Sequence, residues 1–124
     1  MFVGVLRLSF HLPGARSLKE KRMIVRSFRD RVRARLDVSI AEVEHLDLHK
    51  RATFGVAVVS KDASMCDELL ASVASMASTA RDAVLLDRST EILTVGDLTD
   101  RSLGALDTDD SSDASDAGEE DDDA

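Results

Sequence analysis

The sequence predicts an α+β fold, a ferredoxin-like βαββαβ two-layer sandwich in which an antiparallel four-stranded sheet carries two helices on one face. Three observations predict it. Along the chain, segments in which hydrophobic residues recur every two residues, typical of strands, alternate with segments in which they recur every three to four residues, typical of helices. A helix start signal follows the first strand-like segment directly. The segments then succeed one another in the order that this fold requires.

The first strand is predicted at residues 2–12, and it ends at Pro13 and Gly14. Along it, one set of positions is fully apolar and comprises Phe2, Gly4, Leu6, Leu8, Phe10 and Leu12. The alternate set is mixed and comprises Val3, Val5, Arg7, Ser9 and His11. This period of two predicts a strand with one face in the core and the other face away from it.

A capping box predicts the start of the first helix. Ser17 precedes Glu20 by three residues, so the Ser17 hydroxyl can accept from the Glu20 amide while the Glu20 carboxylate accepts from the Ser17 amide. Over roughly five turns, a buried stripe is expected from Leu18, Ile24, Val25, Phe28, Val32 and Leu36. The opposite side, here named the basic stripe, carries Lys19, Arg22, Arg26, Arg29 and Arg33.

The second and third strands are predicted at residues 38–44 and 52–60, and the polar residues 45–50 between them favour a hairpin. Asp62 or Ser64 is expected to cap a second helix. The buried face of that helix is predicted to comprise Met65, Leu69, Val73, Met76 and Ala80.

The fourth strand is predicted at residues 83–95, with an irregularity around residues 87–89. Phe54 is the only aromatic residue of the third strand, whereas RNA-recognition sheets stack bases on two or three rings. We therefore expect Phe54 to pack in the core. Cys66 is expected to be a small buried hydrophobe.

Charge divides the chain into regions. Residues 107–124 contain ten acidic residues and no basic one, which predicts a disordered acidic tail. Residues 97–106 are interpreted as a linker and residues 1–96 as the ferredoxin-like domain. The whole chain has a formal charge of −8, but 16 basic and 14 acidic residues lie outside the tail.

Composition excludes several classes of protein. A single cysteine cannot form a disulfide within the chain, and no stretch approaches the ~20 apolar residues of a membrane-spanning helix. Arg7 interrupts the opening apolar run, so no secretory signal is recognised. We expect a cytoplasmic protein without membrane attachment. No catalytic motif is present, and neither an enzyme activity nor a cofactor is expected.

Several spaced strings resemble the YlxP-like bacterial family of unknown function. They are FVGVL at 2–6, SLKEKR at 17–22, SIAEV at 39–43, DLHKRA at 47–52 and GVAVVS at 55–60. The resemblance covers about residues 1–95 and implies a ferredoxin-like fold. Genes of this family often lie beside those for translation initiation and ribosome maturation factors, which implies a link to RNA or ribosomal particles. It implies no catalytic residue.

The basic stripe is the first candidate site. A row of guanidinium groups can follow a phosphate backbone without reading bases. We therefore expect RNA or a ribonucleoprotein as the partner, contacted through the five stripe residues. The alternative is that the stripe is simply the solvated side of an amphipathic helix. Two roles are open for the acidic tail: it competes with nucleic acid for this stripe, or, as the simpler expectation, it serves solubility alone.

Two further candidates belong to other functional classes. The mixed face of the sheet could form a homodimer or dock a protein partner. His45, Asp47 and His49 bring two imidazoles and a carboxylate into one turn, which could bind a divalent metal in a metal-dependent enzyme. Against the metal, a loop need not bring these side chains together, and local hydrogen bonding is the simpler expectation.

Overall fold

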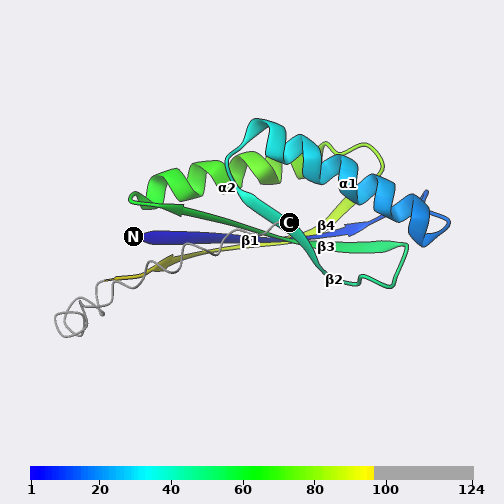
Figure 1. Ribbon diagram of the computed structural model, residues 1–124, viewed down its shortest axis with the longest axis horizontal. Helices are drawn as coiled ribbons and strands as arrows, with labels where there is room; N and C mark the ends of the chain where they lie inside the picture. The colour runs from blue at the N-terminus through cyan, green and yellow to red at the C-terminus, as the bar shows by residue number, and fades with distance from the viewer. Residues whose placement is uncertain (97–124) are drawn as a thin grey trace, which may run out of the picture. The chain divides into compact units, whose positions relative to one another are not determined.

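The computed structural model describes residues 1–96 and confirms the α+β, ferredoxin-like βαββαβ order (Figure 1). Its elements are β1 (Phe2–His11), α1 (Leu18–Arg35), β2 (Ser39–Glu44), β3 (Arg51–Ser60), α2 (Ala63–Ser78) and β4 (Val84–Thr94). Both helices cover one face of the sheet. The predicted linker and acidic tail lie outside the described residues.

The four strands form one antiparallel sheet in the order β2-β3-β1-β4. β1 is central, since it pairs with β3 along its whole length and with β4 on its other side. The register against β4 shifts where Ser9 faces Asp87 while Phe10 faces Leu85, which leaves Leu86 as an extra residue. This bulge lies beside the irregularity that the sequence predicts around residues 87–89.

The core lies between the sheet and the two helices. From β1, the side chains of Leu6, Leu8 and Phe10 are at most 1% exposed, as the period of two predicts. Helix α1 buries Val25, Phe28 and Val32, whereas Leu18, Ile24 and Leu36 of the expected stripe are half-buried. Cys66 is buried, and its thiol lies 3.8 Å from the Phe2 carbonyl oxygen.

Three phenylalanine rings form the centre of the core beneath α1. Phe10, Phe28 and Phe54 contact one another edge to face, with ring centroids 5.2–5.8 Å apart. Such T-shaped pairs add about 0.5–1.5 kcal/mol each beyond their buried area. The expectation that Phe54 is a core residue is confirmed.

The predicted buried face of α2 is confirmed at Val73, but its other fully buried positions are offset from the predicted ones. The fully buried residues are Cys66, Leu70, Val73, Ala74 and Ala77, while Met65 is 44% exposed and Leu69, Met76 and Ala80 are only partly buried. At Gly4 of β1, which has no side chain, Leu70 and Cys66 of α2 pack directly against the strand.

The start of α1 confirms one half of the capping box and corrects the other. The Glu20 amide donates to the Ser17 hydroxyl over 3.1 Å, as expected. The Glu20 carboxylate, however, accepts from the Arg16 amide at 2.7 Å rather than from the Ser17 amide. The start of α2 differs more, because Asp62 occupies the cap position without a side-chain cap hydrogen bond. Within residues 1–96, neither helix is long and apolar enough to cross a membrane.

Candidate nucleic-acid interface

A groove runs between the basic flank of α1 and β2, which is an edge strand of the sheet. Its volume is about 330 Å³. Ile40, Ala41 and Glu42 of β2 form one side. The other side, together with Val25, consists of four members of the basic stripe: Arg22, Arg26, Arg29 and Arg33. We call this feature the basic groove.

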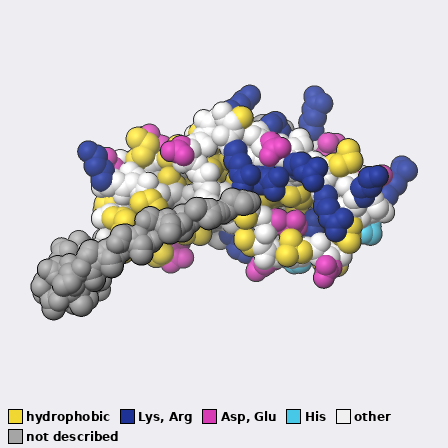
Figure 2. All heavy atoms as spheres, viewed as in Figure 1, with side chains coloured by type: hydrophobic (Ala, Val, Ile, Leu, Met, Phe, Trp, Pro, Cys, Tyr) yellow, Lys and Arg dark blue, Asp and Glu magenta, His cyan; other side chains and the backbone are white. Residues whose placement is uncertain are grey.

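Helical geometry explains the alignment of the four arginines. Steps of four, three and four residues keep Arg22, Arg26, Arg29 and Arg33 on one flank of α1. Lys19 continues the same row one turn earlier and is exposed, but it does not line the groove. Figure 2 shows Lys and Arg side chains gathered over the region of α1. The structure thus brings four of the five predicted stripe residues into one feature.

The four arginines differ in how far they are already engaged. Arg33 donates from Nη2 to the Ile40 carbonyl oxygen at 3.1 Å, which ties α1 to β2. Arg29 is half-buried, and its Nε lies 3.6 Å from a carboxylate oxygen of Asp30. Among the described residues, the side chains of Arg22 and Arg26 are exposed and take part in no hydrogen bond or ion pair. Two guanidinium groups in the groove are therefore available to a ligand.

One acidic residue lines the basic groove, and a buried lysine neutralises it. Glu42 Oε2 lies 2.6 Å from the Lys21 ammonium, and the two side chains are only 14% and 1% exposed. Lys21 also donates to the carbonyl oxygens of His45 at 2.6 Å and Leu48 at 2.7 Å. Because the Lys21 ammonium pairs with the Glu42 carboxylate, Glu42 does not cancel the charge of the arginines that line the groove.

Lys21 is a key residue that the sequence analysis missed. The signal lay in its position, since Lys21, Val25, Phe28 and Val32 follow the same helical spacing and are all buried. A lysine in an otherwise apolar stripe indicates a buried cation with polar partners.

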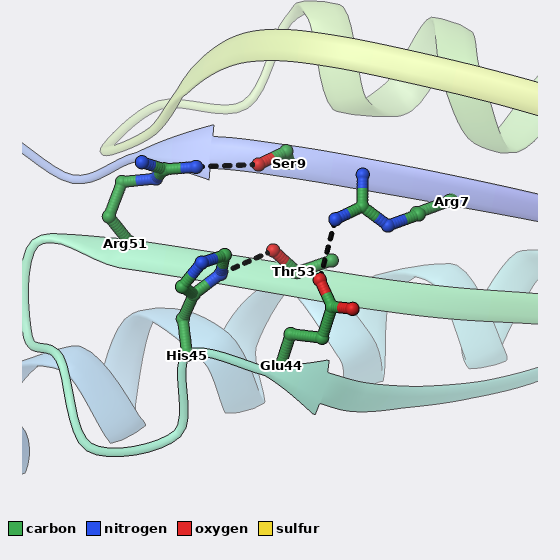
Figure 3. A network of polar contacts seen from close by, with 6 residues as sticks. All are labelled: Arg7, Ser9, Glu44, His45, Arg51 and Thr53. Carbon is green, nitrogen blue, oxygen red and sulfur yellow. Dashed lines mark hydrogen bonds and ion pairs between the residues drawn. The ribbon is translucent and has the colours of Figure 1, made fainter.

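The structure does not bring His45, Asp47 and His49 together. His45 has a positive φ of 64°, and its Nδ1 lies 2.8 Å from the Thr53 hydroxyl oxygen (Figure 3). The carbonyl oxygens of His45 and Leu48 accept hydrogen bonds from Lys21 Nζ. Within residues 1–96, no group of three His, Cys, Asp or Glu side chains could hold a metal ion. Local hydrogen bonding, the alternative expected from the sequence, is what the turn displays.

The sheet face away from the helices, named the open face, has a polar end. Arg7 pairs with Glu44, and Arg51 donates to the Ser9 hydroxyl at 3.3 Å (Figure 3). The hydrogen bond from Arg7, together with its positive charge, lowers the pKa of the Glu44 carboxyl below its ordinary value. These contacts cross from β1 to β2 and β3 and fix the side chains over that end of the sheet.

The other end of the open face is apolar. In the register of the sheet, Val3 faces Val59 on one side and Leu93 on the other, and Val5 faces Ala57. Val5, Val59 and Leu93 are 37%, 64% and 43% exposed. Within residues 1–96, nothing covers these side chains, so the open face presents a small apolar surface.

Known proteins resemble this chain in sequence and in fold. The family described as "Protein of unknown function (DUF503)" matches residues 3–90. The uncharacterized protein YlxP of Bacillus subtilis (strain 168) is 44% identical over 46 residues, which are 37% of this chain and 50% of that relative. The match thus spans about half the length of that relative. A crystallised C-terminal segment of the alpha subunit of aIF2 from Pyrococcus abyssi has a TM-score of 0.42 and 14% identity, covering 77% of this chain and 52% of that one.

Proposed function

The chain belongs to the family described as "Protein of unknown function (DUF503)", as its resemblance to the YlxP-like family predicted, and on that premise we propose that it is a non-catalytic RNA- or ribonucleoprotein-binding protein. The basic groove is the contact surface, and phosphate groups are what it contacts. A partner of this kind, linked to translation or ribosome maturation, implies a cytoplasmic location.

The observation that carries the proposal is the alignment of four arginines along one groove whose acidic residue is already neutralised. Arg22 and Arg33 are separated by 11 residues, or about 16 Å along the helix axis. A row of this length can contact successive phosphates of one strand. Arginine suits this role because its planar guanidinium donates two parallel hydrogen bonds to phosphate oxygens.

The same surface argues against base-specific recognition. Single-stranded bases are recognised by stacking on exposed aromatic rings. The chain has four phenylalanines and no tyrosine or tryptophan, and three of those phenylalanines are buried in the core. Phosphate contacts without base contacts position a nucleic acid but do not select its sequence. We therefore propose binding with little sequence preference.

The test compares two triple variants with the same charge change. Arg22→Glu, Arg26→Glu and Arg29→Glu together should abolish binding of a generic single-stranded RNA without unfolding the protein, because none of these residues belongs to the buried stripe. The control changes Arg16, Lys61 and Arg88, which are exposed residues away from the basic groove, to Glu. If RNA affinity falls equally in both variants, only the net charge of the protein matters and the groove has no special role.

Salt dependence and sedimentation complete the test. Phosphate contacts release counterions, so the affinity of the unaltered protein should fall linearly on a log–log plot against salt, with a smaller slope for each arginine removed. In cell extract, the protein should co-sediment with ribosomal particles until RNase is added. Unchanged RNA binding by the folded groove variant would overturn the proposal.

A second candidate is a protein-interaction module, favoured by the exposed Val5, Val59 and Leu93 of the open face. A homodimer or a partner docked there would bury apolar area, and its affinity would depend little on salt. Val59→Asp should then dissociate the complex and leave RNA binding unchanged. The metal-dependent enzyme at His45, Asp47 and His49 has no comparable support, because within residues 1–96 these side chains do not form a group that could hold a metal ion.

A further inference from the structure

A cavity lies on the flank of α1 opposite to the basic groove, between α1 and the segment that links α2 to β4. Its volume is about 270 Å³. Ile24, Ser27, Phe28 and Arg31 line it from α1, whereas the arginines of the basic groove occupy the other flank of the same helix. The two features lie on opposite flanks of α1 and share only Val25 among the residues that line them.

The floor of this cavity is aromatic. Phe10, Phe28 and Phe54 line it, although these side chains are only 1%, 4% and 2% exposed, so little of each ring reaches the cavity. The rings hold one another in place by their edge-to-face contacts. A rigid apolar floor of this kind favours an apolar ligand and needs no rearrangement to accept one.

The walls leave space because their residues are small. Ala52, Ala80 and Ala83 all line the cavity, where larger apolar side chains would fill it. Ala80 and Ala83 pack against the core but are only partly buried. Unfilled apolar space of this kind forfeits packing contacts that a ligand can restore.

Charge is confined to the rim. Arg31 and Arg81 contribute two cations, and Asp82 contributes one carboxylate. The Arg31 guanidinium carbon lies 5.8 Å from the centroid of the Phe28 ring, directly beside the aromatic floor. Among the described residues, Arg31 and Arg81 form no ion pair, so the rim keeps an excess positive charge over the apolar interior.

We propose that this cavity binds a small planar apolar compound that carries one anionic group, such as an aromatic carboxylate. Its ring would lie on the phenylalanine floor, and its anionic group would pair with Arg31 and Arg81 at the rim. The size is appropriate, because an apolar cavity of about 150 Å³ already holds benzene, and this one has room for a ring with a polar substituent. The proposal is independent of RNA binding.

The experiment uses 2-naphthoate as the probe and follows the methyl groups of Ile24, Ala80 and Ala83 by NMR in the full chain. We expect saturable shifts at these methyl groups and at the three phenylalanine rings. A cationic analogue, 2-naphthylmethylammonium, should bind at least tenfold more weakly. Absence of saturable shifts for 2-naphthoate, or equal binding of the two analogues, would overturn the proposal.

Two kinds of variant separate the apolar and the charged parts of the site. Ala83→Leu should fill the cavity and abolish binding, and Ser27→Leu, at an exposed rim position, should obstruct the mouth without touching the core. Arg31→Gln combined with Arg81→Gln should weaken 2-naphthoate about tenfold and leave a neutral naphthalene derivative unaffected. Undiminished binding by both leucine variants would contradict the assignment.

A matched control addresses the other apolar surface. Val59→Ser removes exposed apolar area from the open face, which lies on the other side of the sheet. It should leave 2-naphthoate binding unchanged. Shifts that map to Val5, Val59 and Leu93 instead would show that the probe binds the open face, and the cavity proposal would then be wrong.

Discussion

The ammonium group of Lys21 lies 2.6 Å from the carboxylate of Glu42, and this buried ion pair joins the first turn of α1 to the edge strand β2. A lysine ammonium has three N–H donors. Here two of them donate to the carbonyl oxygens of His45 and Leu48, and the charge of the ammonium pairs with the Glu42 carboxylate. One side chain thus neutralises the acidic residue of the basic groove and also holds the connection between β2 and β3.

Replacing Lys21 by Met should destabilise the protein strongly. Methionine keeps an apolar stem of similar length, but it leaves the Glu42 carboxylate without its countercharge and two carbonyl oxygens without their donor. Removing one partner of a buried ion pair costs about 3–5 kcal/mol. Urea unfolding should report a loss of this order, whereas Lys19→Met on the exposed side of α1 should change stability by less than about 0.5 kcal/mol. Similar midpoints for the two variants would contradict the structural role of Lys21.

Elements with strong local signals could be predicted from the sequence. The alternation from Phe2 to Leu12 and the pair Ser17 and Glu20 depend on neighbours within one strand or one turn, and both appear in the structure. The buried face of α2 was less predictable. In α2, apolar residues lie on more than one side, and the adjacent Leu69 and Leu70 differ in burial, so the packing of the helix against the sheet, rather than hydrophobicity, decides which side is buried.

The candidate site was predictable only in part for a similar reason. Helical spacing aligned the arginines, but their position beside β2 depends on where the chain returns after α1. The pairing of Lys21 with Glu42 joins residues 21 positions apart in sequence, and no local pattern specifies it. The cavity above Phe10, Phe28 and Phe54 likewise depends on three separate elements.

Gly4 should not tolerate a side chain. A Cβ atom there would lie 2.8 Å from Cδ1 of Leu70 and 3.0 Å from Cβ of Cys66, both of which are buried on α2. Gly4→Ala should therefore force α2 away from β1 and cost about 1–3 kcal/mol. Gly14→Ala is the control, because nothing lies within 4 Å of its added Cβ. Thermal unfolding of the two variants measures the difference, and equal melting temperatures would show that the contact between α2 and β1 adapts freely.

Glu44 should titrate below the ordinary value of 4.5, because Arg7 donates a hydrogen bond to its carboxylate and adds a favourable charge. A pKa that is lower in the folded state means that the pair stabilises the fold above the unfolded pKa, and that this contribution is lost as the pH falls through the folded pKa. Arg7→Gln should raise the Glu44 pKa toward 4.5. The loss of stability should be complete above 4.5 and should vanish as the pH falls through the folded pKa of Glu44.

Carboxyl carbon NMR measures the titration of Glu44 directly. The control is Arg51→Gln, since Arg51 bonds Ser9 and not Glu44. It should leave the Glu44 pKa where it is. High salt should diminish the shift in the unaltered protein, because both side chains are about half exposed and salt screens exposed pairs. If Arg7→Gln left the Glu44 pKa unchanged, the ion pair with Arg7 would be excluded as the cause of the lowered pKa.

Residues 1–96 should fold without the remainder of the chain. The described elements and their core all lie within this range, so a chain that ends at Gly96 retains every contact discussed above. We expect a cooperative unfolding transition with the same midpoint as the full chain. A lower midpoint, or a broad transition, would place the domain boundary further toward the C-terminus.

The same pair of proteins tests the role of the acidic tail. Residues 107–124 carry ten negative charges, which should oppose phosphate binding whether they compete for arginines or repel the nucleic acid. The shorter protein should therefore bind a generic RNA more tightly at low salt, and the difference should shrink as salt rises, because screening shortens the range of the charges to about 10 Å at 0.1 M. Equal affinities at low salt would leave the tail a role in solubility alone. A difference that persists at high salt would indicate a non-electrostatic contribution, which charge counting does not predict.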